Sequence, residues 1–278
     1  MNVQTLDPES IKKILEIPMN NKYYVDIEHD GFNEEAYKQA LLFAAKLAQE
    51  DQQVKRIVCY VQTKRNIGYL EPFFEEGAIK KLLDGNVKVN GFSVPLTIET
   101  KNTYSKNKYS TVNKDIVIAF GMDLEELEVL DDYDCAKYIV AIPWLKERTM
   151  PWIERWDAVE ITGKTRQTVV QASSLSEIAK VAFAELSTCI NMSTGISHPS
   201  DESRAKTYVR ALHKYEDSLN AEDVVSYLVS QLNWTSAHAN EVGKLVKTLN
   251  DGRYFKGGDK TGLQNHYKRW KDKLKQSK

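Results

Sequence analysis

Residues 114–144 read KDIVIAFGMDLEELEVLDDYDCAKYIVAIPW, and this stretch decides the fold. Two apolar runs, IVIAF at 116–120 and YIVAI at 138–142, flank a segment rich in Leu and Glu. Continuous apolar runs with many β-branched residues are typical of central strands that are covered on both faces. A strand, a helix and a second strand in this order predict a β–α–β unit, the building block of a parallel sheet.

The same alternation extends to both sides of this stretch, with an additional Asn90-Gly91 pair that predicts a hairpin turn. After Gly163 the strand signal fades, and only amphipathic helical patterns follow. We therefore predict an α/β domain in residues 1–165 and a helical domain in residues 166–278. The first domain should hold an open, mostly parallel, Rossmann-like sheet with an inserted hairpin. The further strands are expected at 22–28, 54–64 and 158–163, and the further helices of this domain at 33–51, 71–84 and 145–156.

Composition is ordinary for a soluble globular protein, with 42% hydrophobic and 28% charged residues in a chain of 278. The three cysteines lie far apart without a C-x-x-C pair, which argues against a disulfide framework or a zinc ribbon. No signal-peptide pattern and no apolar run of membrane-spanning length is present, so we expect a soluble cytosolic protein. The phosphate-binding and nucleophile motifs G-x-G-x-x-G, G-x-x-x-x-G-K-[ST] and G-x-S-x-G are missing, and no cofactor is predicted.

The carboxyl-terminal stretch 241–278 is strongly basic. It carries eleven Lys and Arg against four Asp and Glu, a balance of +7 in a chain whose net charge is −1. Everything before residue 241 therefore carries −8. A basic, aromatic-containing end on an acidic body predicts a non-catalytic binding protein for nucleic acid or another polyanion. The candidate binding residues are Lys244, Lys247, Arg253, Tyr254, Lys256, Lys268, Arg269 and Trp270.

The segment 221–250 has the outline of a helix-turn-helix motif, with a short turn near Thr235. A recognition helix in the second half would expose His238 and Asn240, together with Lys244 and Lys247, to bases and phosphates. A plain helical bundle with solvated lysines explains the same pattern. Trp270 likewise has two interpretations, a ring stacked on a base or a side chain in the core.

A metal-dependent phosphodiesterase or nuclease is the catalytic alternative. Glu99 and Lys101 form an E-x-K pattern at the end of the predicted hairpin, with Asp84 before its first arm. Asp26 and Glu28 lie where the first strand ends, the edge at which α/β folds usually bind ligands. Carboxylates of this kind could hold Mg²⁺, and the lysine could orient a water. The competing interpretations are a solvated acidic loop and a chance pattern in a chain rich in Lys and Glu.

Two further interpretations concern surfaces. The basic end could serve an adaptor that docks to an acidic protein partner, which the sequence does not separate from nucleic-acid binding. The stretch 101–114, KNTYSKNKYSTVNK, contains no acidic residue, and we expect a long mobile loop in which Tyr104 and Tyr109 could stack on a base. A simple connection between strands is the alternative.

Overall fold

The computed structural model describes residues 20–27, 29–74, 77–162, 175–216 and 219–276. The chain divides into two compact units, Met1–Gln167 and Thr168–Lys278. We call them the α/β unit and the helical unit and describe each by itself.

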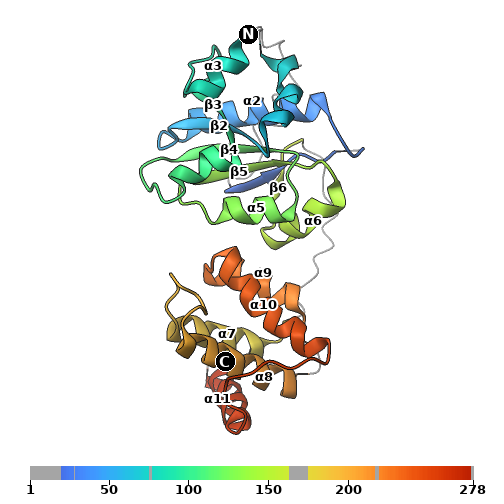
Figure 1. The fold of residues 1–278 in the computed structure, drawn as a ribbon, viewed down its shortest axis with the longest axis vertical. Helices are drawn as coiled ribbons and strands as arrows, with labels where there is room; N and C mark the ends of the chain where they lie inside the picture. Colours follow the sequence, from blue (N-terminus) through green and yellow to red (C-terminus); the bar gives the residue numbers. More distant parts are fainter. Residues whose placement is uncertain (1–19, 28, 75–76, 163–174, 217–218, 277–278) are drawn as a thin grey trace. The chain divides into compact units, whose positions relative to one another are not determined.

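The α/β unit is built on a six-stranded open sheet in the order β3-β2-β4-β5-β1-β6, and every pairing between these strands is parallel (Figure 1). The predicted α/β sheet followed by a helical region is thereby confirmed. The apolar runs IVIAF and YIVAI become β4 and β5, neighbours at the centre of the sheet. The strand bounds are β1 Lys22–Tyr24, β2 Arg56–Val61, β3 Leu96–Thr100, β4 Asp115–Phe120, β5 Ala136–Ile142 and β6 Val159–Glu160.

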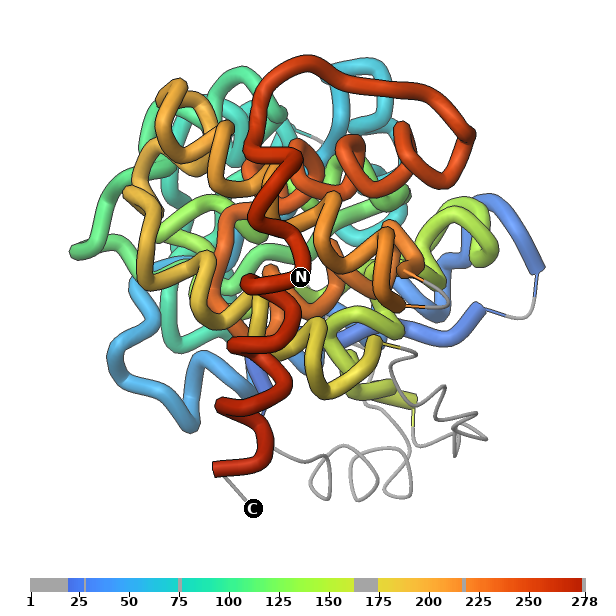
Figure 2. The backbone as a smooth tube through the Cα atoms, turned by 90° about the horizontal axis from the view of Figure 1, so that it is seen from below, coloured from blue at the N-terminus to red at the C-terminus, as the bar shows by residue number. Residues whose placement is uncertain are grey.

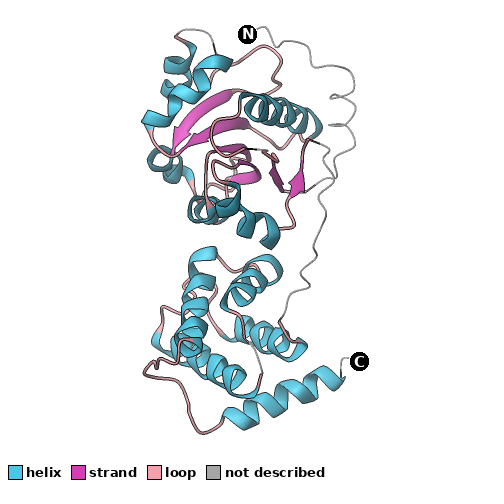
Figure 3. Cartoon of the chain, turned by 90° about the vertical axis from the view of Figure 1, so that its right-hand side faces the viewer, coloured by secondary structure: helices cyan, strands magenta, loops and turns pink. Residues whose placement is uncertain are grey.

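Helices cover both faces of this sheet (Figures 1 and 3). The Ala-rich helix α2 packs with η1 and α3 on one face, and α5 and α6 pack on the other. Asn33 caps the amino end of α2, because its side chain accepts a hydrogen bond from the Ala36 amide at 3.0 Å. The bounds are α2 Glu34–Glu50, η1 Lys64–Phe73, α3 Ala78–Asp84, α4 Lys101–Tyr104, η2 Ser105–Asn107, α5 Leu124–Asp131 and α6 Lys146–Arg155.

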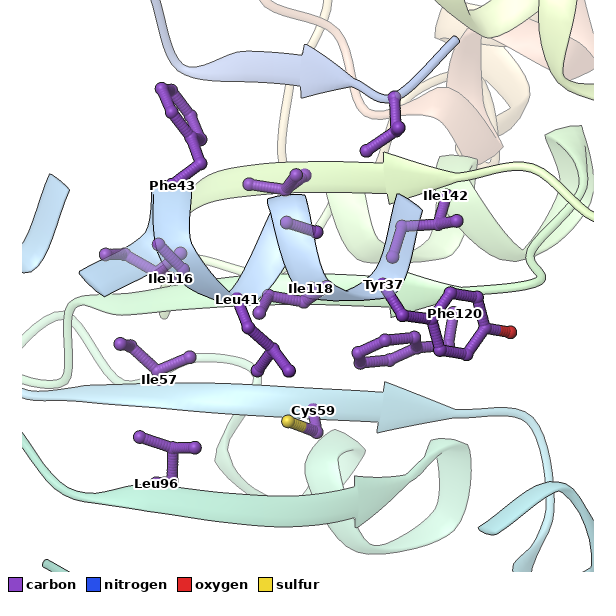
Figure 4. Close-up of a cluster of buried hydrophobic side chains, with 14 of the residues drawn as sticks. Tyr37, Leu41, Phe43, Ile57, Cys59, Leu96, Ile116, Ile118, Phe120 and Ile142 are labelled. Carbon is purple, nitrogen blue, oxygen red and sulfur yellow. The ribbon is translucent and has the colours of Figure 1, made fainter. Parts of the chain in front are cut away.

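Side chains of alternate residues in each central strand lie in two separate apolar cores, one on each face of the sheet. Ile57 and Cys59 of β2 point to the core under α2, whereas Val58 and Tyr60 point to the core over α5 and α6. Figure 4 shows the first of these cores, with side chains of four neighbouring strands converging on Leu41 of α2. Burial on both faces explains why these strands read as continuous apolar runs.

The predicted hairpin forms its turn but not a ladder. The Phe92 amide donates to the Val89 carbonyl at 3.2 Å, which closes a turn around Asn90-Gly91. A two-residue loop would place Val87 opposite Val94. Val87 instead pairs with Leu96 in a single antiparallel bridge, so two additional residues loop out. The second arm then becomes β3 and pairs in parallel with β2, and the antiparallel element is reduced to this one bridge.

The helical unit contains five helices in its described part (Figure 1). Helix α10 packs against α9 and α8, and α11 packs against α8 and α7. The α9–α10 contact is close, because a Cβ at Gly243 would lie 2.6 Å from Val225. No helix in the described part of the chain is long and apolar enough to span a bilayer. The bounds are α7 Glu177–Cys189, α8 Pro199–Tyr215, α9 Ala221–Leu232, α10 Ser236–Asn250 and α11 Leu263–Gln276.

Candidate functional site

Glu185 of α7 organises one side of the basic carboxyl-terminal helix α11. Its carboxylate accepts hydrogen bonds from Arg269 and Lys273 of α11 and from the Tyr208 hydroxyl of α8 at 2.5 Å. Burial alone would raise the pKa of Glu185, but these bonds and the Trp270 indole outweigh it and lower the pKa to about 2. Arg269, a predicted contact for a polyanion, therefore already has a carboxylate partner.

Trp270 belongs to the core of the helical unit. Its side chain is fully buried, and its ring packs edge-on against Tyr208 with the centroids 4.9 Å apart. The indole nitrogen donates to Glu185 at 3.3 Å. The assignment of Trp270 to a binding surface is therefore wrong, since a ring without solvent exposure cannot stack on a base, and the core interpretation holds.

Three lysines remain on the exposed side of α11. Lys268, Lys271 and Lys275 follow one another at spacings of three and four residues, which places them on one face of the helix. None of them forms an ion pair with a residue in the described part of the chain, although Asp272 lies on the same helix. We call these three residues the lysine stripe. Figure 3 shows the carboxyl half of α11, which carries two of them, extending beyond the other helices of this unit.

Hydrogen bonds fix the loop between α10 and α11 to α8. Figure 2 shows the loop as a wide arc. Arg210 donates to the carbonyls of Phe255 and Gly257, and the Asp259 amide donates to the Thr207 hydroxyl at 2.7 Å. Gly258 has a φ of +74°, and a Cβ there would lie 2.8 Å from the side chain of Lys206. The loop is thus a defined surface rather than a loose connection.

Tyr254 stands on this loop between two cations and is 61% exposed. Its ring lies 5.3 Å from the Arg210 guanidinium and 4.8 Å from Lys260 Nζ. A hydrogen bond from Lys260, with the neighbouring positive charges, lowers the pKa of the Tyr254 hydroxyl. Lys256 is exposed nearby, whereas Arg253 forms an exposed ion pair with Asp251 at 3.2 Å. Ring and cations together form a surface of the kind that binds anions and stacked bases.

The first turn of α10 does not present a recognition face. The Thr235 side chain caps this helix, Ser236 and Ala239 are buried, and His238 packs on the loop before α8. A Cβ at Gly195 of that loop would lie 2.4 Å from the His238 ring. The expectation that His238 is free to read bases is therefore wrong. Lys244 and Lys247, further along α10, are exposed as expected.

The residues of the catalytic alternative are dispersed. Glu99 accepts from Arg56 at 3.2 Å, while Lys101 begins α4 and so does not share a strand face with Glu99. Asp26 follows β1 and pairs with Lys146. Three strands separate β1 from β3, which is about 19 Å at the usual strand spacing.

The two remaining acidic candidates do not join the others at one site. Asp84 ends α3, and Glu28 lies outside the described residues. Within the described part of the chain, no group of three His, Cys, Asp or Glu side chains could hold a metal ion.

The stretch 101–114 does not offer two tyrosines to a base. Tyr104 is fully buried, and its hydroxyl donates to Asp115 at 3.0 Å. The residues 101–107 form short helical turns instead of an extended loop. Tyr109 is 74% exposed and lies next to Lys108.

A cavity that the sequence did not predict lies at the carboxyl ends of β2, β4 and β5, with a volume of about 290 Å³. The chain leaves β2 toward the face covered by α3 and leaves β4 toward the opposite face, covered by α5. Ligands of open α/β sheets bind at such a switch point. One wall of the cavity is aromatic, formed by Tyr37, Tyr69, Phe120 and Trp144.

The opposite wall of this switch-point cavity is polar. Gln62 follows β2 and donates to Glu126 at 2.9 Å, and Glu126 also accepts from the Asp123 amide at 3.4 Å. Asp123 Oδ1 is buried without a hydrogen-bond partner among the described residues, and Arg148 lies 4.0 Å from Oδ2. Asn66 of η1 completes this wall.

A family model described as a domain of unknown function (DUF1889) matches residues 175–271, which run from the start of the described helical unit into α11. The match covers less than half of the chain, and its description names no activity. No curated protein and no solved structure matches the chain.

Proposed function

We propose that the protein is a non-catalytic binding protein that engages a nucleic-acid strand through the helical unit. The observation that carries this proposal is the lysine stripe, Lys268, Lys271 and Lys275, which has no ion-pair partner in the described part of the chain. The neighbouring Arg269 and Lys273 are already matched by Glu185. The positive charge left over therefore lies on one helix face, where an external anion can reach it.

The dimensions of the lysine stripe agree with this proposal. Lys275 lies seven positions after Lys268, which is about 10.5 Å along a helix axis. Each strand of a duplex advances about 3.4 Å per phosphate, so the stripe spans roughly three phosphates. Lys256 and the cation-flanked Tyr254 add a charge and an exposed ring in the same unit.

The test is fluorescence anisotropy of the full chain with labelled single-stranded DNA, single-stranded RNA and duplex DNA, at about 50 mM and about 200 mM salt. Affinity should fall steeply with salt, because bound cations release counterions. Changing Lys268, Lys271 and Lys275 together to Gln should weaken binding by about tenfold or more at low salt. The slope of log K against log salt should shrink by about 2 to 3.

A matched control changes Lys55, Lys80 and Lys81 of the α/β unit to Gln. These lysines are exposed as well, so the net charge changes equally without touching the stripe. An equal loss in both triple variants, or no binding to any nucleic acid at low salt, would refute the proposal. Tighter binding of polyglutamate than of any nucleic acid would favour the adaptor for an acidic protein instead.

The proposal contains no catalytic step. Of the acidic residues weighed for a phosphodiesterase, Glu99 lies on β3 and is matched by Arg56, Asp84 ends α3, and Asp26 follows β1. No observation gives that alternative an advantage.

A further inference from the structure

The switch-point cavity of the α/β unit has the features of a ligand-binding site. All of its lining residues belong to the α/β unit. Its volume of about 290 Å³ is near the lower end of the range for small-molecule pockets. This size suits one compact ligand rather than a dinucleotide. The aromatic wall supplies stacking surface, and the polar wall supplies a few groups that can orient a ligand.

The aromatic wall is preformed. Trp144 packs on Tyr69 with the ring centroids 5.1 Å apart, and Phe32 stacks on the same Tyr69 ring at 5.6 Å. Gly121 follows β4 with a φ of +67°, and a Cβ there would already lie 3.5 Å from Trp144. Tyr69 remains 37% exposed, so a flat ligand can reach this wall.

The polar wall leaves several hydrogen-bonding groups for a ligand. Asn66 Oδ1 accepts from the amide and the hydroxyl of Thr63, and its Nδ2 has no partner among the described residues. Gln62 uses Nε2 for Glu126, which leaves Oε1 as an acceptor. A donor and an acceptor on neighbouring side chains match the edge of a nucleobase, which presents both kinds of group.

Asp123 provides the most specific requirement. Its Oδ1 has no accessible surface, but the side chain as a whole keeps 36% exposure, so a ligand in the cavity can reach the carboxylate through its other oxygen. Hydroxyl groups of a ribose are suitable donors to a carboxylate at the end of a strand. Tyr37 also lines the cavity, and Figure 4 shows its hydroxyl pointing past Phe120 on the side where the strands end.

The charges at the cavity disfavour a phosphate. The first turn of α5 carries Glu125 and Glu126 behind the capping residue Asp123, and the cavity lining holds a single cation, Arg148. A phosphate at this helix end would face three carboxylates. From the aromatic wall, the unused amide atoms of Asn66 and Gln62 and the accessible Asp123 carboxylate, we infer that the switch-point cavity binds a nucleoside that carries no phosphate.

The experiment uses the full chain and saturation-transfer NMR with adenosine, guanosine, cytidine and uridine at up to about 1 mM, followed by calorimetry of any that bind. At least one nucleoside should bind, and its 5′-monophosphate should bind about tenfold more weakly or worse. Asp123→Asn should weaken nucleoside binding by about tenfold or more, because a neutral amide replaces the charged acceptor of the ribose hydroxyls. Asn remains a good helix cap, so α5 should keep its fold.

Tyr69→Ala tests the aromatic wall separately and should also weaken binding by about tenfold, because a stacking surface is removed. Glu125→Gln is the matched control, since it removes a charge from the same helix turn at an exposed residue outside the cavity. Absence of binding by all four nucleosides would overturn the inference. So would equal or tighter binding of the monophosphate, or affinities that Asp123→Asn and Tyr69→Ala leave unchanged. The lysine-stripe variant should bind the nucleoside like the parent, which keeps this test separate from that of nucleic-acid binding.

Discussion

In each unit one carboxylate accepts hydrogen bonds from basic side chains and from a tyrosine hydroxyl: one arginine in the α/β unit, and an arginine and a lysine in the helical unit. The two carboxylates lie at different depths. In the α/β unit, Asp115 has no solvent exposure and accepts from Arg56 through two bonds of 3.0 Å and from the Tyr104 hydroxyl at 3.0 Å. In the helical unit, Glu185 holds Arg269 and Lys273 at the protein surface, and its side chain keeps 11% exposure.

Because of this difference in depth, the pKa values of the two carboxylates shift in opposite directions. Burial raises the pKa of Asp115 more than Arg56 and Tyr104 lower it, and the nearby Glu99 raises it further. For Glu185 the burial effect is overcome by its donors and cations, and the pKa falls to about 2. The cluster around Asp115 therefore belongs to the core of the α/β unit. The cluster around Glu185 pairs two surface cations of α11 and leaves the other lysines of that helix without an ion pair in the described part of the chain.

The largest expected effect compares one arginine from each unit. Arg56→Ala should lower the free energy of unfolding by about 3 to 5 kcal/mol, because Asp115 is left charged and buried without its cation. Arg269→Ala should cost about 1 kcal/mol or less, since Glu185 keeps Lys273, Tyr208 and solvent. Urea unfolding of the full chain, followed by circular dichroism and tryptophan fluorescence, measures both. Equal costs would show that depth does not separate the two clusters.

Two aromatic residues of the basic end should differ in the same way. Trp270→Ala should cost about 3 kcal/mol or more, because it leaves a large cavity among α7, α8 and α11. Tyr254→Ala removes an exposed ring and should change the stability by less than about 0.5 kcal/mol. Thermal and urea denaturation of both variants give the comparison, and a small effect of Trp270→Ala would contradict its core position.

The pH dependence of the helical unit should follow Glu185. Its pKa is lowered from 4.5 to about 2 on folding, so the stability that it contributes is present above pH 4.5 and is lost as the pH falls toward 2. Because solvent screens Arg269 and Lys273, we expect a contribution of about 1 to 2 kcal/mol. Asp115 has the opposite sign, since a raised pKa favours the folded state at low pH. Acid titration of urea midpoints should show a smaller acid slope in Glu185→Gln than in the parent chain. An unchanged slope would assign the acid sensitivity to other carboxylates.

The strands of the α/β unit were predictable because their signal is local. The runs that became β2, β4 and β5 are apolar on both faces, and this pattern is visible without any knowledge of their neighbours. The strand order is set by long-range contacts, which the periodicity of one segment does not contain. Gln62, Gly121 and Trp144 follow the observed ends of β2, β4 and β5, but only the order β2-β4-β5 brings them to one cavity.

The basic carboxyl-terminal end shows that surface contacts, like the strand order, depend on long-range partners that the sequence of one segment does not reveal. Its excess of positive charge is evident from the sequence, but the partner of Arg269 is Glu185, 84 residues earlier in the chain. Adjacent cations such as Lys268 and Arg269 are therefore equivalent in the sequence and different in the fold. Trp270 lies among exposed cations in the sequence, yet its position on α11 places it on the buried face of the helix. A helical-wheel pattern with Leu263, seven positions earlier, could have indicated this.

The smallest expected effect on stability belongs to the lysine stripe. Changing Lys268, Lys271 and Lys275 to Gln removes three exposed charges from α11, and Lys275 lies in its last turn, where cations interact favourably with the helix dipole. The summed loss of stability should stay below about 1 kcal/mol, since each exposed charge contributes a few tenths. If the stripe serves only the helix dipole, the variant should lose this small amount and nothing else. If it binds nucleic acid, the variant should lose most of the salt-dependent affinity while its urea midpoint barely moves. Measuring unfolding and anisotropy on the same preparation distinguishes the two, and a stability loss comparable to that of Trp270→Ala would mean that these lysines hold the helix in place.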